Sequence, residues 1–305
     1  MLRKSRSIPK FLVTGSNGQV GFELRRSLAP LGEVIALDRA TCDLTQLAAV
    51  RRVVREHRPN VIVNAGAYTA VGQAEGDAAT AFAVNATAVG VLAEEARALG
   101  GLLVHYSTDY VFDGTKPEPY VETDATNPQT VYGKSKLAGE HAIAASGAKA
   151  FVLRTSWVAG VHGENFVRKI LRLARERDHL HVVSDQVGAP TTADLVADVT
   201  AYIVRRWVSD GVEDGALGVY HVSAAGETTW HSCAMEIIRY VEARGMPLRT
   251  ALAAVNPITS DVYAPAVQRP LNSRLNTSKL VDAFDLDLPD WQRGMWKLLD
   301  RLLLE

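Results

Sequence analysis

The sequence has few cysteines, almost no net charge and no long apolar run. Its two cysteines, Cys42 and Cys233, lie far apart and outside any metal-ligand or redox spacing, so we expect reduced thiols and a cytoplasmic location. The formal net charge of -1 provides no overall field that would attract nucleic acid. No uninterrupted apolar run approaches the ~20 residues that span a bilayer. We therefore expect neither a nucleic-acid-binding nor a membrane protein.

What the sequence does contain is enough apolar material for a full core. It has 305 residues, of which 47% are hydrophobic, and this length allows one large or two modest domains. Residues 1–8 are basic, but they are not followed by the apolar segment and cleavage site of a signal peptide. We therefore expect this segment to be a disordered leader.

Short apolar runs alternate with helical patterns through the first half of the chain. Strands are expected at 11–14, 34–37, 61–63, 102–106 and 151–153. Helices are expected at 20–28, 47–56 and 78–99, and from Pro128 through 143. This alternation is typical of βαβ units whose parallel sheet is buried on both faces. The sequence therefore predicts a doubly wound α/β fold.

A glycine-rich segment, Gly15-Ser16-Asn17-Gly18-Gln19-Val20-Gly21, joins the first expected strand to the first expected helix. The first glycine permits a tight turn, the second lets the backbone approach a pyrophosphate, and the third allows close packing of helix on strand. The N-terminus of the helix then directs N–H groups at the phosphates. This context predicts a dinucleotide site formed by Gly15, Asn17, Gly18, Gln19, Val20 and Gly21.

Further cofactor contacts are expected where the next two strands end. Asp38 suits the adenosine ribose of NADH, whereas the neighbouring Arg39 suits the 2′-phosphate of NADPH, so we expect both cofactors to be used. Asp43 and Leu44 are expected along the adenine, although Asp43 alternatively caps the following helix. The small residues that follow the third strand leave room for a cofactor ribose; they are Ala65, Gly66 and Ala67.

Tyr132 and Lys136 form a Y-x-x-x-K pattern, and this spacing places them on one face of a helix. A free tyrosine has a pKa of ~10, too high for efficient acid–base work at neutral pH. A neighbouring ammonium lowers that pKa, so we expect Lys136 to tune Tyr132 as a proton donor. The segment 104–110 ends a strand in hydroxyl groups, in the crevice where α/β sheets bind ligands.

Seven motifs occur in one order along the chain. They are GSNGQVGFEL (15–24), VIVNAGAYTA (61–70), STDYVFDG (107–114), YGKSKLAGE (132–140), RTSW (154–157), DQVGAPT (185–191) and RPLNSRLN (269–276). With them the chain resembles the extended short-chain dehydrogenase/reductase family, and within it the dTDP-4-dehydrorhamnose reductases. The resemblance covers nearly the whole chain after the leader.

The resemblance implies a catalytic set of Thr108, Tyr132 and Lys136. Thr108 would hydrogen-bond the substrate carbonyl, Tyr132 would protonate its oxygen, and Lys136 would also hold the nicotinamide ribose. The implied reaction is reduction of the C4 ketone of dTDP-4-dehydro-L-rhamnose to dTDP-L-rhamnose, a donor for surface polysaccharide, by NADPH or NADH. The implied substrate contacts are Thr108, Asp109, Tyr110, Trp157, Asn165, Gln186 and Arg269.

Two of these contacts have a plainer interpretation. Arg269 is expected on the diphosphate because a guanidinium binds phosphate oxygens bidentately, but it is alternatively a surface ion pair. Trp157 is expected against the sugar, but it is alternatively core packing. Some similar proteins carry Mg²⁺ at a dimer interface, and Glu23 and Asp194 lie near matching positions; solvated carboxylates are the alternative there. A monomer and a homodimer both remain open.

Combined with the strand pattern, the motifs divide the chain into two lobes. A Rossmann domain that binds NAD(P) is expected over residues 9–156, completed by about 192–228. A smaller nucleotide-sugar lobe is expected from 157–191 and 229–290, followed by a C-terminal helix over 291–305. In the second half, helices are expected at 166–177, 194–208 and 229–243, and strands at 182–183 and 218–222.

Three other functions share much of this pattern. Nucleotide-sugar dehydratases use an Asp-Glu pair after the catalytic threonine, but Tyr110 follows Asp109 here, so the base for water elimination is missing. Nucleotide-sugar epimerases are harder to exclude, although Trp157 and the DQVGAPT segment favour a reductase. A non-catalytic regulatory subunit similar to this family also stays open.

Overall fold

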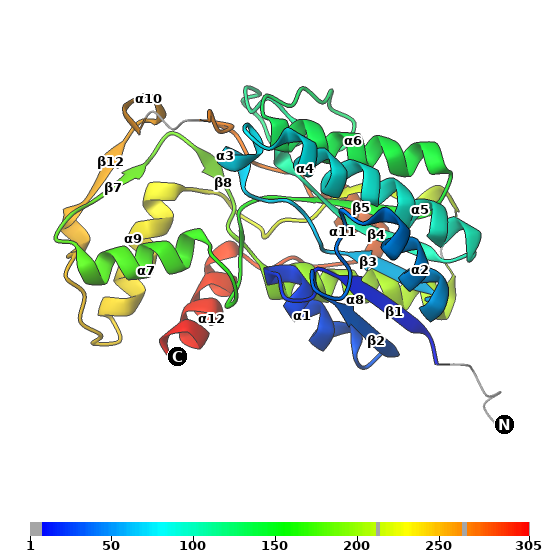
Figure 1. Ribbon diagram of the computed structural model, residues 1–305. Coiled ribbons are helices and arrows are strands. Elements are labelled where there is room, and N and C mark those ends of the chain that lie inside the picture. Colours follow the sequence, from blue (N-terminus) through cyan, green and yellow to red (C-terminus); the bar gives the residue numbers. More distant parts are fainter. Residues whose placement is uncertain (1–7, 212–213, 264–266, 305) are drawn as a thin grey trace.

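The structure, a computed structural model, describes residues 8–211, 214–263 and 267–304, so residues 1–7 of the expected leader lie outside the described residues. The chain forms a larger body built on a central sheet and a smaller body of helices and short strands beside it (Figure 1). The larger body draws on both halves of the sequence, whereas the helices and paired strands of the smaller body come from the second half.

The larger body contains a six-stranded sheet with the strand order β10-β5-β4-β3-β1-β2, in which every pairing is parallel. The strands are β1 (Lys10–Thr14), β2 (Glu33–Leu37), β3 (Val61–Asn64), β4 (Leu102–Thr108), β5 (Lys149–Thr155) and β10 (Gly218–His221). The strand order reverses between β1 and β3, which opens a crevice at the carboxyl ends of these strands. The predicted doubly wound α/β fold is confirmed.

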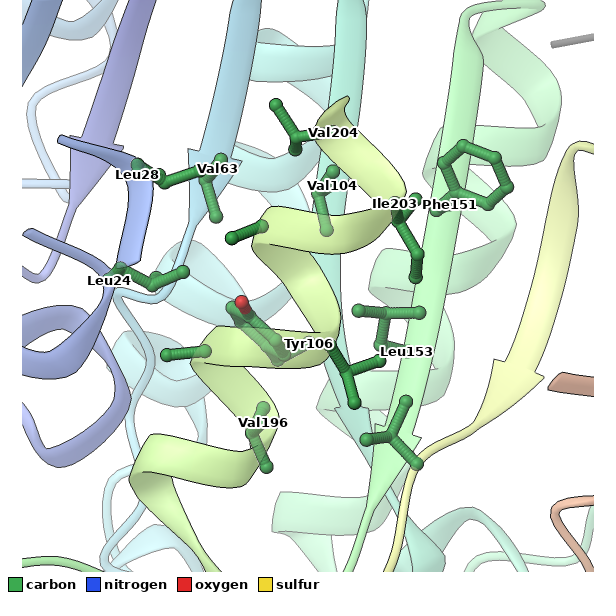
Figure 2. Packing of buried hydrophobic residues seen from close by; sticks show 14 of the residues in the cluster. Leu24, Leu28, Val63, Val104, Tyr106, Phe151, Leu153, Val196, Ile203 and Val204 are labelled. Atoms are coloured by element: carbon green, nitrogen blue, oxygen red, sulfur yellow. The ribbon is translucent and has the colours of Figure 1, made fainter. Parts of the chain in front are cut away.

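One face of the sheet is covered by α1 (Gln19–Leu28), α8 (Ala193–Asp210) and α11 (Ser278–Phe284). Figure 2 shows the centre of this layer, where Val196 and Ile203 of α8 lie over the strands beside Val104, Tyr106 and other buried side chains. Every second residue of each strand points to this side because side chains alternate along a strand. Burial on both faces accounts for the near-continuous apolar sequence of the strands.

The opposite face is covered by α2 (Leu47–His57), α5 (Ala88–Ala98) and α6 (Val131–Ser146), which pack on the intervening strand residues. Helix α6 begins at Val131 because the hydroxyl of Thr130 accepts a hydrogen bond from the Gly133 N–H at 3.0 Å. It ends at Gly147, whose φ of 65° lies in the left-handed region that favours glycine. These caps fix the position of the helix that carries Tyr132 and Lys136.

The smaller body packs three helices against a two-stranded parallel ribbon. The helices are α7 (Phe166–Glu176), α9 (Trp230–Glu242) and α12 (Trp291–Leu303), and the ribbon is β7 (Leu180–Val183) with β12 (Val255–Ile258). The predicted C-terminal helix is part of this core, since Met295 and Leu299 are fully buried among residues of α7 and α9.

Short elements complete the connections between the longer helices and strands. The short strands are β6 (Val158–Ala159), β8 (Val187–Gly188), β9 (Thr191–Thr192) and β11 (Thr228–Thr229). The short helical turns are α3 (Val71–Ala74), η2 (Asp109–Val111), η3 (Asp214–Ala216), η4 (Leu252–Ala254) and α10 (Ser260–Tyr263). Within the described ranges, no helix has both the length and the apolarity needed to cross a membrane.

The helix predicted over 78–99 is confirmed, with a π-helical turn in its middle. The segment forms α4 (Ala78–Phe82), a π-helical turn η1 (Ala83–Thr87) and α5. The widened turn buries Asn85, whose amide binds the backbone of Tyr68 on both sides and donates to Ser135 Oγ at 3.0 Å. Such turns often occur near functional sites, and this one fastens the helix to α6.

The packing of one segment bears on where the two lobes divide. Segment 278–288, assigned to the substrate lobe, packs on the sheet: the Phe284 ring lies 5.7 Å from Phe151 and 5.5 Å from Tyr220. Strand β10 and helix α8 lie in the same body. We therefore propose that the Rossmann domain comprises residues 9–156, about 192–222 and about 278–288, and that the described residues of 157–191, 223–277 and 289–304 form the substrate lobe.

Candidate active site

A cavity of about 940 Å³ lies at the carboxyl ends of the strands, between the two bodies. Most of the residues expected to bind cofactor or substrate line it. These are Gly15, Asn17, Gly18, Gln19, Val20, Asp38, Arg39, Asp43, Leu44, Ala65, Gly66, Ala67, Thr108, Asp109, Tyr110, Tyr132, Lys136 and Trp157. Four expected residues do not line it: Gly21, Asn165, Gln186 and Arg269.

The glycine loop meets the geometric demands of a pyrophosphate cradle. Gly15 has a φ of 65°, and a Cβ there would lie 2.6 Å from the Gly66 backbone. A Cβ on Gly21 would lie 2.1 Å from the Gly15 carbonyl oxygen, so Gly21 acts by letting the helix approach the loop. Helix α1 begins at Gln19 with no side-chain cap at Gly18, which leaves N–H groups available for an anion. These residues fit a bound dinucleotide.

Asp38 is held at the end of β2 by its neighbours. Its carboxylate accepts hydrogen bonds from the Thr41 N–H at 3.0 Å and from Asn17 Nδ2 at 2.9 Å. These bonds, chiefly those from Thr41, lower the pKa of Asp38. The carboxylate is therefore ionised and faces the cavity beside the exposed Arg39. Asp38, which suits NADH, and Arg39, which suits NADPH, therefore lie next to each other at the cavity.

Asp43 is not the cap of the next helix. Helix α2 begins at Leu47 with Gln46 at its N-cap position, and Asp43 instead accepts two hydrogen bonds of 2.9 Å from Thr45. This local turn holds Asp43 and Leu44 at the wall of the cavity.

Thr108, Tyr132 and Lys136 come together at the cavity wall, from the end of β4 and from the first turns of α6. The Tyr132 side chain lines the cavity together with Thr108, and its ring packs edge-on against Tyr110 with the centroids 5.5 Å apart. Burial raises the pKa of Tyr132 to about 12. The phenol is therefore protonated at neutral pH, as a proton donor must be.

The expected lowering of the Tyr132 pKa by Lys136 is wrong for this arrangement. The Lys136 ammonium is directed away from the phenol: Nζ donates to the Tyr106 carbonyl oxygen at 2.5 Å and lies 3.2 Å from His105 Nε2. Burial lowers the pKa of Lys136 itself to about 8, and the nearby Glu140 opposes that shift. Desolvation is the largest cause at both residues: at Lys136 it outweighs the charge of Glu140, and at Tyr132 the charge of Asp109 acts in the same direction.

Three buried polar atoms at the cavity lack a hydrogen-bond partner among the described residues: Asp109 Oδ2, Thr155 Oγ1 and Ser156 Oγ. Burial raises the pKa of Asp109 to about 6. Unpaired buried polar atoms are costly, so their position here indicates a polar ligand. Sequence reasoning missed Thr155 and Ser156; the available signal was their place at the carboxyl end of a parallel strand.

Trp157 is part of the cavity wall and also packs against another aromatic side chain, so contact with the sugar stays a prediction. It lines the cavity, and its ring stacks on Trp230 with the centroids 3.4 Å apart and the planes 11° apart. Its φ of 50° is unusual for a bulky residue, and such strain is concentrated at functional sites. A Cβ on Gly188 would lie 2.6 Å from the Trp157 ring, so Gly188 makes room for the indole.

The remaining substrate contacts expected in the second lobe lie elsewhere. Asn165 caps α7 by accepting from the Arg168 N–H, and its amide donates to Gln19 Oε1 at 3.0 Å. Gln186 is buried and donates to Ser260 Oγ at 3.0 Å. These two side chains are occupied by the protein itself, so direct substrate binding by either one stays a prediction.

Arg269 lines a second cavity of about 250 Å³, which shares Tyr110 with the large one. Its guanidinium is exposed, and no ion pair involving it is found in the described part of the chain. The surface ion-pair interpretation therefore has no partner among the described residues. The charge lies beside the substrate end of the site, where an anion would be attracted.

The two carboxylates expected at a metal site are already paired with cations. Glu23 accepts from Arg301 at 2.8 Å and from Arg26 at 3.3 Å, and Asp194 accepts from Lys297 at 2.8 Å. Among the described residues, no group of three or more His, Cys, Asp or Glu side chains converges. Within the single chain these two carboxylates are neutralised by arginine and lysine side chains, and a Mg²⁺ site shared between two subunits stays a prediction.

A doubly wound fold, a glycine-rich phosphate cradle and a Tyr–Lys pair in one cavity define a dinucleotide-dependent oxidoreductase of the short-chain dehydrogenase/reductase type. Residues 9–304 match the family described as RmlD substrate binding domain, and the chain belongs to this family. The expected family and enzyme class are confirmed.

Relatives of known identity agree with this placement. The chain is 48% identical over 285 residues to dTDP-4-dehydrorhamnose reductase of Burkholderia thailandensis, with 93% of this chain and 95% of the relative covered. It is 46% identical over 295 residues to the Salmonella typhimurium enzyme, with coverage of 95% and 97%. The crystal structure of the Bacillus anthracis enzyme in complex with NADP is similar, with a TM-score of 0.85, 32% identity and coverage of 98% and 99%.

Proposed function

We propose that this protein reduces the C4 ketone of dTDP-4-dehydro-L-rhamnose to dTDP-L-rhamnose, using NADPH or NADH. The observation that carries the proposal is the presence of Thr108, Tyr132 and Lys136 in the same cavity as the glycine loop. The close relatives named dTDP-4-dehydrorhamnose reductase support the choice of substrate. The product would serve the synthesis of surface polysaccharide, in the cytoplasm.

In this proposal the protein binds, orients and supplies one proton. The bound nicotinamide supplies the hydride. Thr108 holds the ketone oxygen, and Tyr132 donates its phenolic proton to that oxygen as the C4–O bond becomes an alcohol. Lys136 hydrogen-bonds the cofactor ribose through the N–H that its contacts with Tyr106 and His105 leave available. The glycine loop positions the dinucleotide through its backbone, so the cofactor and the ketone meet in one geometry.

Asp109 and the Trp157–Trp230 pair support a sugar beside the catalytic set. Asp109 has an unpaired carboxylate oxygen at the cavity, suited to a sugar hydroxyl. The stacked indoles offer an apolar surface for a pyranose ring. Arg269 would attract the diphosphate from its neighbouring cavity.

The test is a turnover assay with the purified chain. NADPH or NADH is mixed with the dTDP-4-keto-sugar, cofactor oxidation is followed by absorbance, and the product is identified by NMR. Stoichiometric dTDP-L-rhamnose is the expected result, with slower reaction of UDP- and GDP-linked keto-sugars. Cofactor binding without oxidation would instead indicate a regulatory subunit, and an epimerised keto-sugar without net oxidation of NADPH would indicate an epimerase.

A further inference from the structure

Three polar side chains form a row across the central sheet. Thr14 pairs in register with Asn64, and Asn64 pairs in register with His105, on the adjacent strands β1, β3 and β4. Their apolar neighbours Leu12 and Leu103, two residues earlier on the same strand faces, pack under the helices α2, α5 and α6. The row therefore points to the α6 side of the sheet.

The row is continuous and buried. Thr14 Oγ1 lies 2.6 Å from Asn64 Oδ1, and the other end of the Asn64 amide lies 3.0 Å from His105 Nδ1. The exposed fraction is 0% for Thr14, 1% for Asn64 and 0% for His105. Buried polar groups are costly unless they are paired, so an arrangement of this kind in a sheet core has to be compensated by a specific contact.

The row ends at the catalytic ammonium. His105 Nε2 lies 3.2 Å from Lys136 Nζ, and the Tyr106 carbonyl oxygen lies 2.5 Å from the same atom. An ammonium has three N–H donors and no acceptor, so these two contacts leave one N–H for a group in the cavity that Lys136 lines. Both contacts come from residues of β4, so this strand holds the ammonium in place.

Donor accounting fixes the state of the imidazole. Nε2 faces a donor, so it must be the acceptor, and the proton of the neutral ring lies on Nδ1. In the structure Thr14 Oγ1 donates to Asn64 Oδ1, and Asn64 Nδ2 faces Nδ1. A half-turn of the Asn64 amide exchanges its oxygen and nitrogen, so that Nδ1–H donates to the amide oxygen and the amide NH₂ donates to Thr14 Oγ1. Burial, followed by the charge of Lys136, lowers the pKa of His105 well below its usual range, in agreement with a neutral ring.

We propose that His105, oriented by Asn64 and Thr14, is a positioning residue that accepts an N–H of Lys136 and keeps the ammonium charged and directed toward the cofactor. This inference rests on the proposed function only for the role of Lys136 in turnover. It assigns the stabilisation of the Lys136 charge to His105, a residue of β4. Thr14 directly precedes Gly15, so the row also joins the cofactor loop to the catalytic helix.

The other ionisable groups near Lys136 are Glu140, Tyr132 and Asp109. Glu140, one turn along α6, favours the ammonium, but its carboxylate is shared with Arg154 at 2.6 Å and with Ser107 at 2.5 Å. Tyr132 lies one turn earlier on the same helix and is protonated at neutral pH. Asp109 lies beyond Tyr132, from the turn after β4. His105 is thus the direct side-chain acceptor of the ammonium among the described residues.

The experiment measures NADPH and NADH affinity against pH by fluorescence, with His105→Leu, His105→Gln and wild type. For wild type we expect binding to weaken as pH rises through about 8, where Lys136 loses its proton. Leucine removes the acceptor, so the same weakening should begin roughly one pH unit or more lower. Glutamine places an amide oxygen near the Nε2 position and should restore most of the shift.

A matched control is His221→Gln. His221 is an equally buried histidine on β10 of the same sheet, with Nδ1 held by the backbone oxygens of Tyr120 and Asn276. Its replacement should leave the pH dependence of binding unchanged. If His105→Leu follows the wild-type curve, or if glutamine does no better than leucine, the proposal is overturned.

One measurement does not depend on the variants folding. Long-range ¹H–¹⁵N NMR of the wild-type protein reports which ring nitrogen of His105 carries the proton. A proton on Nδ1 supports the proposal, and a proton on Nε2 overturns it. Because binding and tautomer are both measured without the keto-sugar, a failure of turnover would contradict the proposed function and leave this test intact.

Discussion

The two lobes hold their site residues in different ways. In the Rossmann domain, most expected residues lie at strand ends or in the first turns of a helix, with Asp43 and Leu44 in the turn between β2 and α2, and all but Gly21 reach one cavity. In the second lobe, Trp157 reaches that cavity, whereas Asn165, Gln186 and Arg269 do not line it. The first group is positioned by the backbone of regular elements, and the second by turns and long connections.

This difference shows where a sequence motif alone is enough to place a side chain in the site. A parallel sheet brings the carboxyl ends of its strands together whatever the side chains are, so a polar residue at a strand end reaches the crevice. A residue in a connection has no such guarantee. Its side chain can cap a helix, as Asn165 does, or bind a neighbouring loop, as Gln186 does. The following changes test this contrast.

The largest effect is expected for Tyr132→Phe. The ring and its packing against Tyr110 remain, but the proton donor is lost, so kcat should fall by about 10²–10⁴-fold while cofactor affinity stays nearly unchanged. Steady-state kinetics and fluorescence titration measure the two quantities. Tyr220→Phe is the control, because its hydroxyl donates to the Ala216 carbonyl away from the cavity. A near-normal kcat in Tyr132→Phe would remove Tyr132 from the chemistry.

Arg269→Ala tests whether the second cavity belongs to the substrate site. A charge-assisted hydrogen bond to the diphosphate predicts a KM for the dTDP-sugar raised by roughly 10- to 150-fold, with kcat largely kept. Arg269→Lys should recover only part of the loss, because an ammonium lacks the bidentate fork. If both KM and kcat are unchanged, Arg269 lies outside the site. The expected residues of the second lobe then reach the site less often than proposed.

The sequence predicted the Rossmann half well because the spacing of its apolar residues and its turn-forming residues determine the strands and helices. The strands end within a residue or two of their expected limits, and Gly15 adopts the positive φ that its turn requires. The row Thr14–Asn64–His105 was not predictable, since it depends on the register of three strands distant in sequence. The π-helical turn at Asn85 and the docking of Phe284 on the sheet likewise depend on tertiary packing.

Asn165→Leu is expected to lower the stability of the fold more than it weakens substrate binding. The change removes the cap of α7 and the bond to Gln19 that ties the glycine loop to the second lobe. Loss of a cap costs about 0.5–2 kcal/mol, which urea denaturation measures. Thr229→Ala, which removes the cap of α9 without a bond to Gln19, is the matched control. A KM increase comparable to that of Arg269→Ala, at unchanged stability, would make Asn165 a substrate residue after all.

The smallest effect is expected at Asp38, within the well-predicted half. Its carboxylate suits the ribose of NADH and repels a 2′-phosphate, while the exposed Arg39 beside it attracts one. Wild type should therefore discriminate weakly between NADH and NADPH. Asp38→Ala removes both the acceptor and the charge, and should shift the ratio of kcat/KM toward NADPH. Both groups are exposed to water, so we expect a shift of about fivefold or less. Asp38→Asn separates the two causes, because it keeps an acceptor for the Thr41 N–H and removes only the charge. If asparagine shifts the ratio as far as alanine, charge repulsion explains the preference; if it shifts the ratio little, ribose recognition does. An unchanged ratio in both variants would show that the end of β2 does not select the cofactor, even though its residues line the cavity.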